Sequence, residues 1–315
     1  MAHRRKYSIL SQTITDSVHV ANLPRTSIHD GYALKISMRL TNTSGASATP
    51  MIADILSAIT EISLVSDSVR NHYAMNGLDL ARLNYRVDRV NKVLDMTYSA
   101  LANDAYVDTA FVLYLDEGEI LAIAHTNLEL KVLFGSTAGT GIDISNAKCE
   151  IELIEEICSE AELKARYGEK YEKLAEPKVY ALSATCDANT EFTGFLDLPT
   201  GTLLKGAMLT FSADPSMFGL LRTVPDRVEL MKQDWTIARW LDELIYGTTL
   251  PVHVVNMDFG VQWQANGVGK DGWTYSKGDI QLAAKTSSST TVRYVSIEQI
   301  VDIDLYKKTY AFTTY

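Results

Sequence analysis

The side chains in this sequence that could do chemistry are its histidines, its carboxylates and its three cysteines, and their spacing matches no catalytic or metal-binding pattern. The six histidines are scattered. His19 and His29 could approach each other, but nothing places a carboxylate or a third ligand beside them. The sequence has no GxSxG, HExxH or Walker motif. We therefore expect no enzymatic activity, no metal and no cofactor.

The cysteines and the net charge exclude several further classes of protein. Cys149, Cys158 and Cys186 are odd in number and form no CxxC pair, so we predict reduced, mostly buried thiols. The formal net charge of −10 argues against broad, sequence-independent binding of nucleic acid. No run reaches the ~18 apolar residues of a membrane-spanning helix, and the N-terminus does not resemble a signal peptide. We expect the protein to stay in the compartment where it is made, or to leave it within a larger particle.

Three stretches could bind a ligand or a surface. The basic start, His3, Arg4, Arg5 and Lys6, could contact an anionic membrane or a packaged genome, and a solvated terminus is an equal alternative. Trp263, Trp273 and Tyr275 flank a glycine-rich turn and could stack on sugars, although aromatics packed against their own sandwich or a subunit contact are favoured. The acidic residues at 116–119 and 214 could bind calcium, but solvated turns are the preferred interpretation.

The elements that must position these residues are mostly strands. Alternating apolar and polar residues, or short β-branched runs, predict strands at 32–40, 58–65, 109–115, 127–134, 148–157, 179–185, 191–198, 203–211, 252–259, 279–284 and 291–297. Helices are predicted at 69–84, after the N-cap residues Ser66, Asp67 and Ser68, and at 159–175. A third helix is predicted at 234–246, where the apolar residues share one face, at Ile237, Leu241, Leu244 and Ile245.

The order of these elements is repeated along the chain. Each half runs through a strand, a polar turn and a helix, and then through two strands joined by a turn of small residues. The spacing agrees as well, because Phe111 to Glu150 is 150 − 111 = 39 residues and Val254 to Arg293 is 293 − 254 = 39 residues. The first half carries an insertion at 87–106 that the second half lacks.

Short strands with Gly, Ser and Thr turns predict an all-β protein built of antiparallel sandwiches or jelly rolls, and they disfavour a parallel α/β sheet. The expected organisation is an N-terminal arm at 1–25, a first jelly roll at 26–158, a helical linker at 159–177 and a second jelly roll at 178–315.

This organisation resembles the double jelly-roll major capsid proteins of tailless, often membrane-containing icosahedral viruses such as tectiviruses and corticoviruses. The resemblance covers residues 31–300 and rests on the two β-rich repeats, the helix in each, the helical linker and the short arm. It implies two tandem eight-stranded jelly rolls, each with a short helix. It also implies homotrimers of pseudo-hexagonal outline that tile an icosahedral shell.

The resemblance implies partners and a location as well. The chain would bind other copies of itself, and it would have access to internal membrane lipid and to minor capsid or vertex proteins. It would not bind nucleic acid in a sequence-specific manner. The arm that carries His3, Arg4, Arg5 and Lys6 would lie on the inner face of the capsid, after assembly in the host cytoplasm. The alternatives are a carbohydrate-binding or glycan-processing tandem β-sandwich, or a phage tail or spike component. A trimer favours the capsid protein, whereas a monomer that binds sugar favours the binding module.

Overall fold

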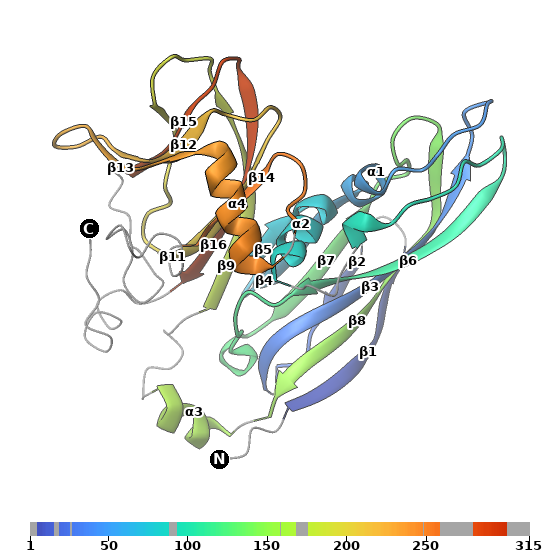
Figure 1. The fold of residues 1–315 in the computed structure, drawn as a ribbon. Helices are drawn as coiled ribbons and strands as arrows, with labels where there is room; N and C mark the ends of the chain where they lie inside the picture. The colour runs from blue at the N-terminus through green and yellow to red at the C-terminus, as the bar shows by residue number, and fades with distance from the viewer. Residues whose placement is uncertain are drawn as a thin grey trace. The chain divides into compact units, whose positions relative to one another are not determined.

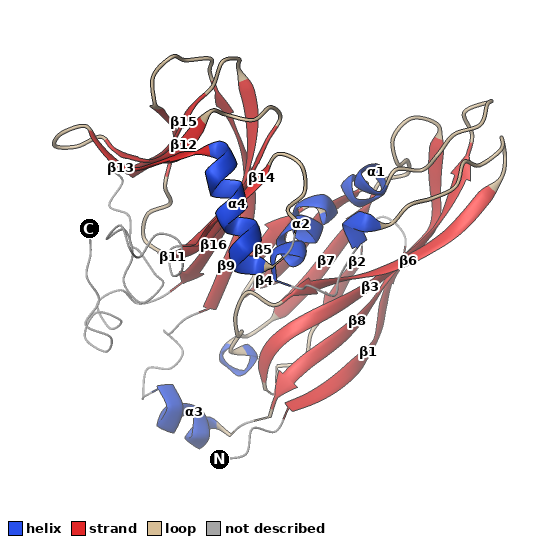
Figure 2. Cartoon of the chain, in the orientation of Figure 1, coloured by secondary structure: helices blue, strands red, loops and turns tan. Residues whose placement is uncertain are grey.

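The structure is a computed structural model in which strands predominate (Figures 1 and 2). It describes residues 5–15, 19–25, 27–87, 93–157, 159–167, 176–247, 249–258 and 280–300. The chain divides into two compact units, Met1–Glu172 and Lys173–Tyr315. None of the helices in these ranges has the length and apolar character needed to span a bilayer.

The first unit contains eight strands in two antiparallel sheets. The strands are β1 (Arg5–Thr15), β2 (His19–Asn22), β3 (Ile28–Asn42), β4 (Ile59–Ser66), β5 (Arg70–Met75), β6 (Tyr106–Leu115), β7 (Leu128–Phe134) and β8 (Ile142–Glu156). One sheet has the order β1-β8-β3-β6, and in the other the order is β5-β4-β7-β2. The helical segments are α1 (Ile52–Ser57), α2 (Gly77–Val87), η1 (Val93–Asp95), η2 (Ala122–Ala124) and α3 (Glu160–Tyr167).

The second unit has the same composition of elements. Its strands are β9 (Glu176–Cys186), β10 (Thr193–Asp197), β11 (Leu203–Phe211), β12 (Met217–Arg222), β13 (Val228–Asp234), β14 (Val254–Asp258), β15 (Ile280–Lys285) and β16 (Thr290–Ile300), and its helix is α4 (Trp235–Tyr246). One sheet has the order β9-β16-β11-β14 and the other has the order β10-β15-β12-β13.

The strand order is therefore identical in the two units. Counted within each unit, the strands lie in the orders 1-8-3-6 and 2-7-4-5, and a helix connects the fifth strand to the sixth. An eight-stranded sandwich of two four-stranded antiparallel sheets is the jelly-roll architecture. The predicted all-β class with two tandem eight-stranded jelly rolls is confirmed. The two units repeat one order of elements, in which two strands, and not one as predicted, precede the helix.

Alternation of side chains along the strands creates the core of each sandwich. In β3, the residues Leu34, Ile36, Met38 and Leu40 are buried, and the residues between them are at least partly exposed. The same alternation runs along β7, where Leu128, Leu130, Val132 and Phe134 are buried. Because successive side chains of a strand point to opposite faces, each sheet presents one apolar face to the interior of the sandwich.

The helix predicted at 69–84 is wrong in its first part, because residues 70–75 form β5. Ser66, Asp67 and Ser68 do not cap a helix there. Asp67 and Ser68 have φ angles of 52° and 59°, so they form a tight turn of the type I′ kind that joins β4 to β5. A short polar sequence suits both a helix cap and a hairpin turn, and pairing with β4 decides between them.

The arm predicted at 1–25 is wrong for residues 5–15, which form β1, and for residues 19–22, which form β2 and pair with β7. Arg5–Thr15 pairs antiparallel with β8, so this stretch is the first strand of the first jelly roll. Its β-branched and aromatic residues suit a strand, and β8 offers the hydrogen-bonding partners that a free arm lacks. The helix α1 and the strand β12 were not predicted, since each is a short apolar run without a clear period.

The predicted linker at 159–177 contains α3 and spans the boundary between the two units. The helix begins with a capping box. The Ser159 hydroxyl accepts a hydrogen bond from the Glu162 backbone N–H, and the Ser159 backbone N–H donates to the Glu162 carboxylate at 2.8 Å. The predicted remainder of this helix, residues 168–175, lies outside the described residues.

The close packing of α1 against α2 gives a first testable prediction. A Cβ atom at Gly77 would lie 2.7 Å from the Leu56 carbonyl oxygen and 2.8 Å from the Ile59 Cβ. We expect Gly77→Ala to lower the free energy of unfolding by about 1–3 kcal/mol through overpacking. Gly135→Ala is the control, because its nearest contact is 3.3 Å and its expected loss is smaller. Equal unfolding midpoints for the two variants in guanidinium would contradict the packing argument.

Candidate functional site

The binding stretches predicted from the sequence lie at positions that do not test them. His3 and Arg4 lie outside the described residues, and Arg5 and Lys6 open β1 in register with Glu156 and Glu155 of β8. The aromatic residues Trp263, Trp273 and Tyr275 also lie outside the described residues. Both stretches stay predictions.

The described cysteines are buried, as predicted. Cys149 and Cys186 are free thiols in the interiors of the two units, and Cys158 lies outside the described residues. Burial raises the pKa of the Cys149 thiol to about 12, and the neighbouring Glu150 carboxylate adds to this. A thiol that stays protonated at neutral pH is a poor nucleophile, so Cys149 is a core residue.

The acidic turn predicted at 116–119 contributes to a small carboxylate cluster in the first unit. Oxygen atoms of Asp30, Glu119 and Glu156 lie within 4.8 Å of one another. Carboxylate oxygens are the ligands that calcium prefers. Each of these carboxylates also interacts with other groups of the protein, so the cluster alone does not assign an ion.

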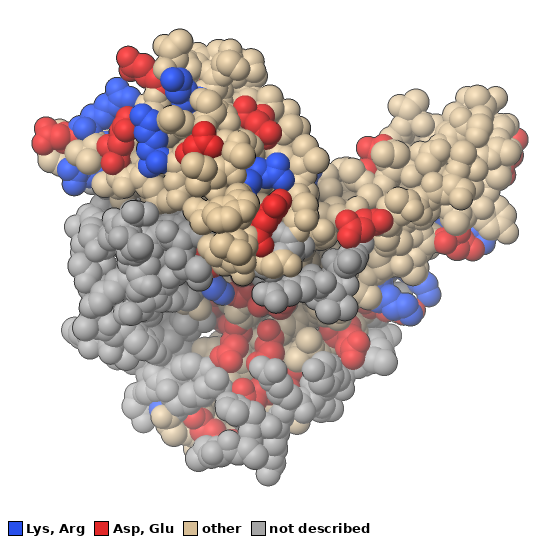
Figure 3. All heavy atoms as spheres, in the orientation of Figure 1, with Lys and Arg blue, Asp and Glu red and all other residues tan. Residues whose placement is uncertain are grey.

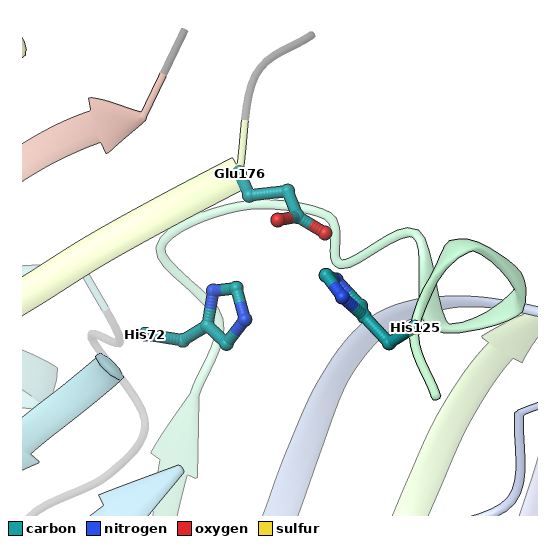
Figure 4. Close-up of side chains that lie close together, drawn as sticks. All are labelled: His72, His125 and Glu176. Carbon is teal, nitrogen blue, oxygen red and sulfur yellow. The ribbon is translucent and has the colours of Figure 1, made fainter. Parts of the chain in front are cut away.

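Among the described residues of the first unit, three histidines are buried: His29 on β3, His72 on β5 and His125 just after η2. The rings of His72 and His125 lie edge to face, with their centroids 5.6 Å apart (Figure 4). Glu176, the third side chain labelled in that figure, opens β9 of the second unit. A hydrogen bond holds each ring in place. His29 Nδ1 lies 2.6 Å from the Tyr32 hydroxyl, His72 Nε2 lies 2.8 Å from the Ser66 hydroxyl, and His125 Nδ1 lies 2.8 Å from the Asp67 carboxylate.

Burial controls the electrostatics of this cluster. It lowers the pKa of His29 to about 4; Glu155 and the Pro24 backbone partly oppose the effect, and His125 adds to it. Burial alone would raise the pKa of Asp67, but hydrogen bonds from Thr126 and His125 outweigh it and hold that pKa well below its usual range. His29 is thus neutral and Asp67 ionised near pH 7.

This cluster of buried histidines was not predicted from the sequence. His72 and His125 lie on elements that are distant in the chain, and Asp67 was interpreted as a cap residue. The only available signal was the hairpin-forming character of Asp67 and Ser68, from which β5 and the inward direction of His72 would have followed.

Asp67 provides a second testable prediction. Its carboxylate accepts hydrogen bonds from the Thr126 hydroxyl and backbone N–H, both at 2.7 Å, and contacts His125. We expect Asp67→Ala to lower the free energy of unfolding by about 2–3 kcal/mol, because the bonds are lost and alanine must adopt a left-handed conformation. Asp67→Asn keeps an acceptor oxygen and tolerates that conformation, so thermal unfolding should show a clearly smaller loss. An alanine variant as stable as the asparagine variant would refute this account.

The helix α4 of the second unit has an unusual distribution of apolar residues. Its inner face is formed by Trp235, Ala238 and the fully buried Asp242, whose carboxylate accepts a hydrogen bond from the Asn256 backbone N–H of β14. Its outer face carries Ile237, Trp240 and Leu244, which are 56%, 60% and 64% exposed. The predicted helix is confirmed, but part of its predicted apolar face, at Ile237 and Leu244, is directed away from the core.

Comparisons with known proteins agree with this architecture. No model of a protein family matches the sequence, and no curated protein matches it. The chain is similar in structure to the major capsid protein of Sulfolobus turreted icosahedral virus, with a TM-score of 0.84 and 15% identity over 98% of this chain and 99% of that chain. The major capsid protein P2 of bacteriophage PM2 matches with a TM-score of 0.61 and 12% identity, over 95% and 98% of the two chains. The chain has the double jelly-roll fold. The Faustovirus major capsid protein also matches this fold, with a TM-score of 0.56 and 8% identity over 95% and 90% of the two chains.

The double jelly-roll fold makes α2 and α4 equivalent helices, since each connects the fifth strand of its jelly roll to the sixth. They differ in their surroundings. In α2, buried residues cover more than half of the circumference, at Asp79, Leu80, Ala81, Leu83 and Asn84, and Leu78, Arg82 and Tyr85 on the remaining side are half-buried. The candidate functional feature of the described residues is therefore the exposed apolar face of α4.

Proposed function

We propose that this chain is the major capsid protein of an icosahedral virus, a structural building block that turns over no substrate. The observation that carries the proposal is the presence of two jelly rolls of identical strand order in one chain. The similarity to the capsid protein of the Sulfolobus virus extends over 98% of the chain, so both jelly rolls and their connection are included.

Duplication of one domain explains how such a chain could tile a surface. Three copies, each with two similar domains, form a ring with six similar corners, and repeated contacts between equivalent surfaces allow a shell to close. The chain would therefore form homotrimers first and then bind other trimers. Reduced, buried thiols such as Cys149 and Cys186 agree with assembly in a host cytoplasm.

The basic start of the chain has a place in this proposal. Arg5 and Lys6 are the first residues of β1, the first strand of the first jelly roll, and His3 and Arg4 come directly before them in the sequence. On the inner face of a shell, they would meet internal membrane lipid, the genome or a minor capsid protein. Their positive charge suits an anionic surface.

The alternatives have no support from the matched structures. The similar structures are capsid proteins, and none of the three is a carbohydrate-binding or glycan-processing sandwich or a tail or spike component. The experiment that separates these functions is the mass of the purified chain in solution by light scattering. We expect three times 34.9 kDa, with particles of six-cornered outline in electron micrographs. A monomer that binds sugar saturably would overturn the proposal.

A further inference from the structure

The outer face of α4 is a continuous apolar stripe. Ile237, Trp240 and Leu244 follow the i, i+3, i+7 spacing, which places them within about 60° of arc around the helix. Val252 is also largely exposed and follows Pro251, whose carbonyl oxygen accepts a hydrogen bond from Arg239 of α4. In the second unit, basic and acidic side chains are mixed over the visible face, with uncharged surface between them (Figure 3).

The stripe is held by a well-anchored helix. The Asp234 carboxylate caps the N-terminus by accepting hydrogen bonds from the backbone N–H groups of Thr236 and Ile237, and Gly247 ends the helix in a left-handed conformation with φ 64°. Asp242 ties the inner face to β14. A surface presented by a rigid element loses little conformational entropy when it binds a partner.

The equivalent helix of the first unit, α2, is covered by other helical segments. The helices α1 and η1 pack against α2, and they come from the connection between β3 and β4 and from the insertion that precedes β6. In the second unit, the corresponding connections are short, at 212–216 and 247–253. The described residues of those two connections contain no helix that could cover α4. Of these two equivalent helices, α2 is therefore covered by other helices of its own jelly roll, whereas the outer face of α4 is exposed.

The chemistry of the stripe favours a protein partner. At their measured exposures, the three side chains present roughly 300–350 Å² of apolar surface, within the range of the largest patch on a typical monomer. A stable interface buries about 800 Å² on each partner, so the stripe could form the centre of one, with Trp240 as its main anchor. A membrane-binding helix would carry several basic residues beside its apolar face, whereas Arg239 here lies 3.9 Å from Glu243.

We propose that Ile237, Trp240 and Leu244 of α4 form a contact surface for a second copy of this chain within the capsomer. The proposal rests on the proposed function, because a self-assembling capsid protein places copies of itself at high local concentration. It goes beyond that function by assigning one of the contacts that hold the capsomer together to a defined helix face, and by assigning the second jelly roll to that contact.

The first test measures assembly. We expect the double variant Trp240→Glu, Leu244→Glu to have the mass of a monomer by light scattering under conditions in which the wild-type chain is a trimer, with an unchanged circular dichroism spectrum. The control is Val69→Glu, which places a charge on a side chain that is 83% exposed at the turn between β4 and β5, and should leave the trimer intact. A trimeric double variant overturns the inference and leaves the proposed function standing. A wild-type chain that stays monomeric at every concentration tested overturns both.

The second test does not depend on a disruptive variant. Ile237→Cys is introduced together with Cys158→Ser, so that the described native thiols are the buried Cys149 and Cys186. We expect a maleimide to modify Cys at 237 at least tenfold more slowly in the trimer than in chain diluted to the monomer. Equal rates in both states would mean that the stripe stays open, and slow modification in the monomer would mean that another segment of the same chain covers it. Either result overturns the inference.

Discussion

Trp235→Ala is expected to lower the free energy of unfolding of the second jelly roll by about 3–5 kcal/mol, whereas Trp240→Ala on the same helix should change it by less than about 0.5 kcal/mol. Trp235 is buried between the two sheets of this unit. Its ring centroid lies 5.3 Å from that of Phe211 on β11 and 5.9 Å from that of Phe218 on β12, both edge to face. Replacement by alanine leaves a cavity that is lined by residues of both sheets.

The two tryptophans form a matched pair for this measurement. They lie on one helix and differ in burial, Trp235 being buried and Trp240 being 60% exposed. Unfolding should be followed by hydrogen exchange of the second-unit amides, at concentrations at which the chain is monomeric, because the two jelly rolls need not unfold together. Similar losses for the two variants would show that the burial of Trp235 and the exposure of Trp240 are wrongly assigned. In the assembled trimer, the difference between the losses of unfolding free energy for the two variants should be smaller, because Trp240 then contributes to the contact between subunits.

The strands were predictable from the sequence where one face of the strand is buried and the other is exposed to solvent. The alternation that runs from Tyr32 to Leu40 repeats every second residue, so the period alone identifies the strand and its inner face. The hairpin of β4 and β5 was not predictable, because Ser66, Asp67 and Ser68 are equally suited to a cap and a turn. The choice depends on pairing with β4 and on the contacts of Asp67 with Thr126, which are far apart in the chain.

The helix α4 shows a different limit. The sequence predicted the helix and an apolar side, but a periodic pattern does not say what covers that side. The pattern also hides the inner face, because Asp242 is polar and fully buried against β14. The buried histidines were beyond sequence reasoning for a similar reason, since β3, β5 and the segment after η2 are brought together only by the jelly-roll connections.

The stability of the first jelly roll should fall as the pH decreases from 6.5 to 4, and His29 should account for about 3 kcal/mol of that loss. His29 is fully buried, and its pKa is lowered from 6.5 to about 4. Below pH 6.5, the unfolded chain binds a proton at this residue while the folded chain does not. The stabilising effect of neutral His29 is therefore complete above pH 6.5 and is lost as the pH falls toward 4.

The groups around His29 make this residue testable on its own. Glu155 and the Pro24 backbone favour its charged form, His125 disfavours it, and Tyr32 shares a hydrogen bond with it. We expect His29→Gln to reduce the difference in unfolding free energy between pH 7 and pH 4.5 by about 2–3 kcal/mol. The control is His253→Gln, because His253 lies beside Asp214 in the second jelly roll, outside the unit whose unfolding is followed. If His29→Gln and the wild-type chain lose the same free energy over this range, His29 is not the group that resists protonation, and the acid sensitivity of the first jelly roll has another source.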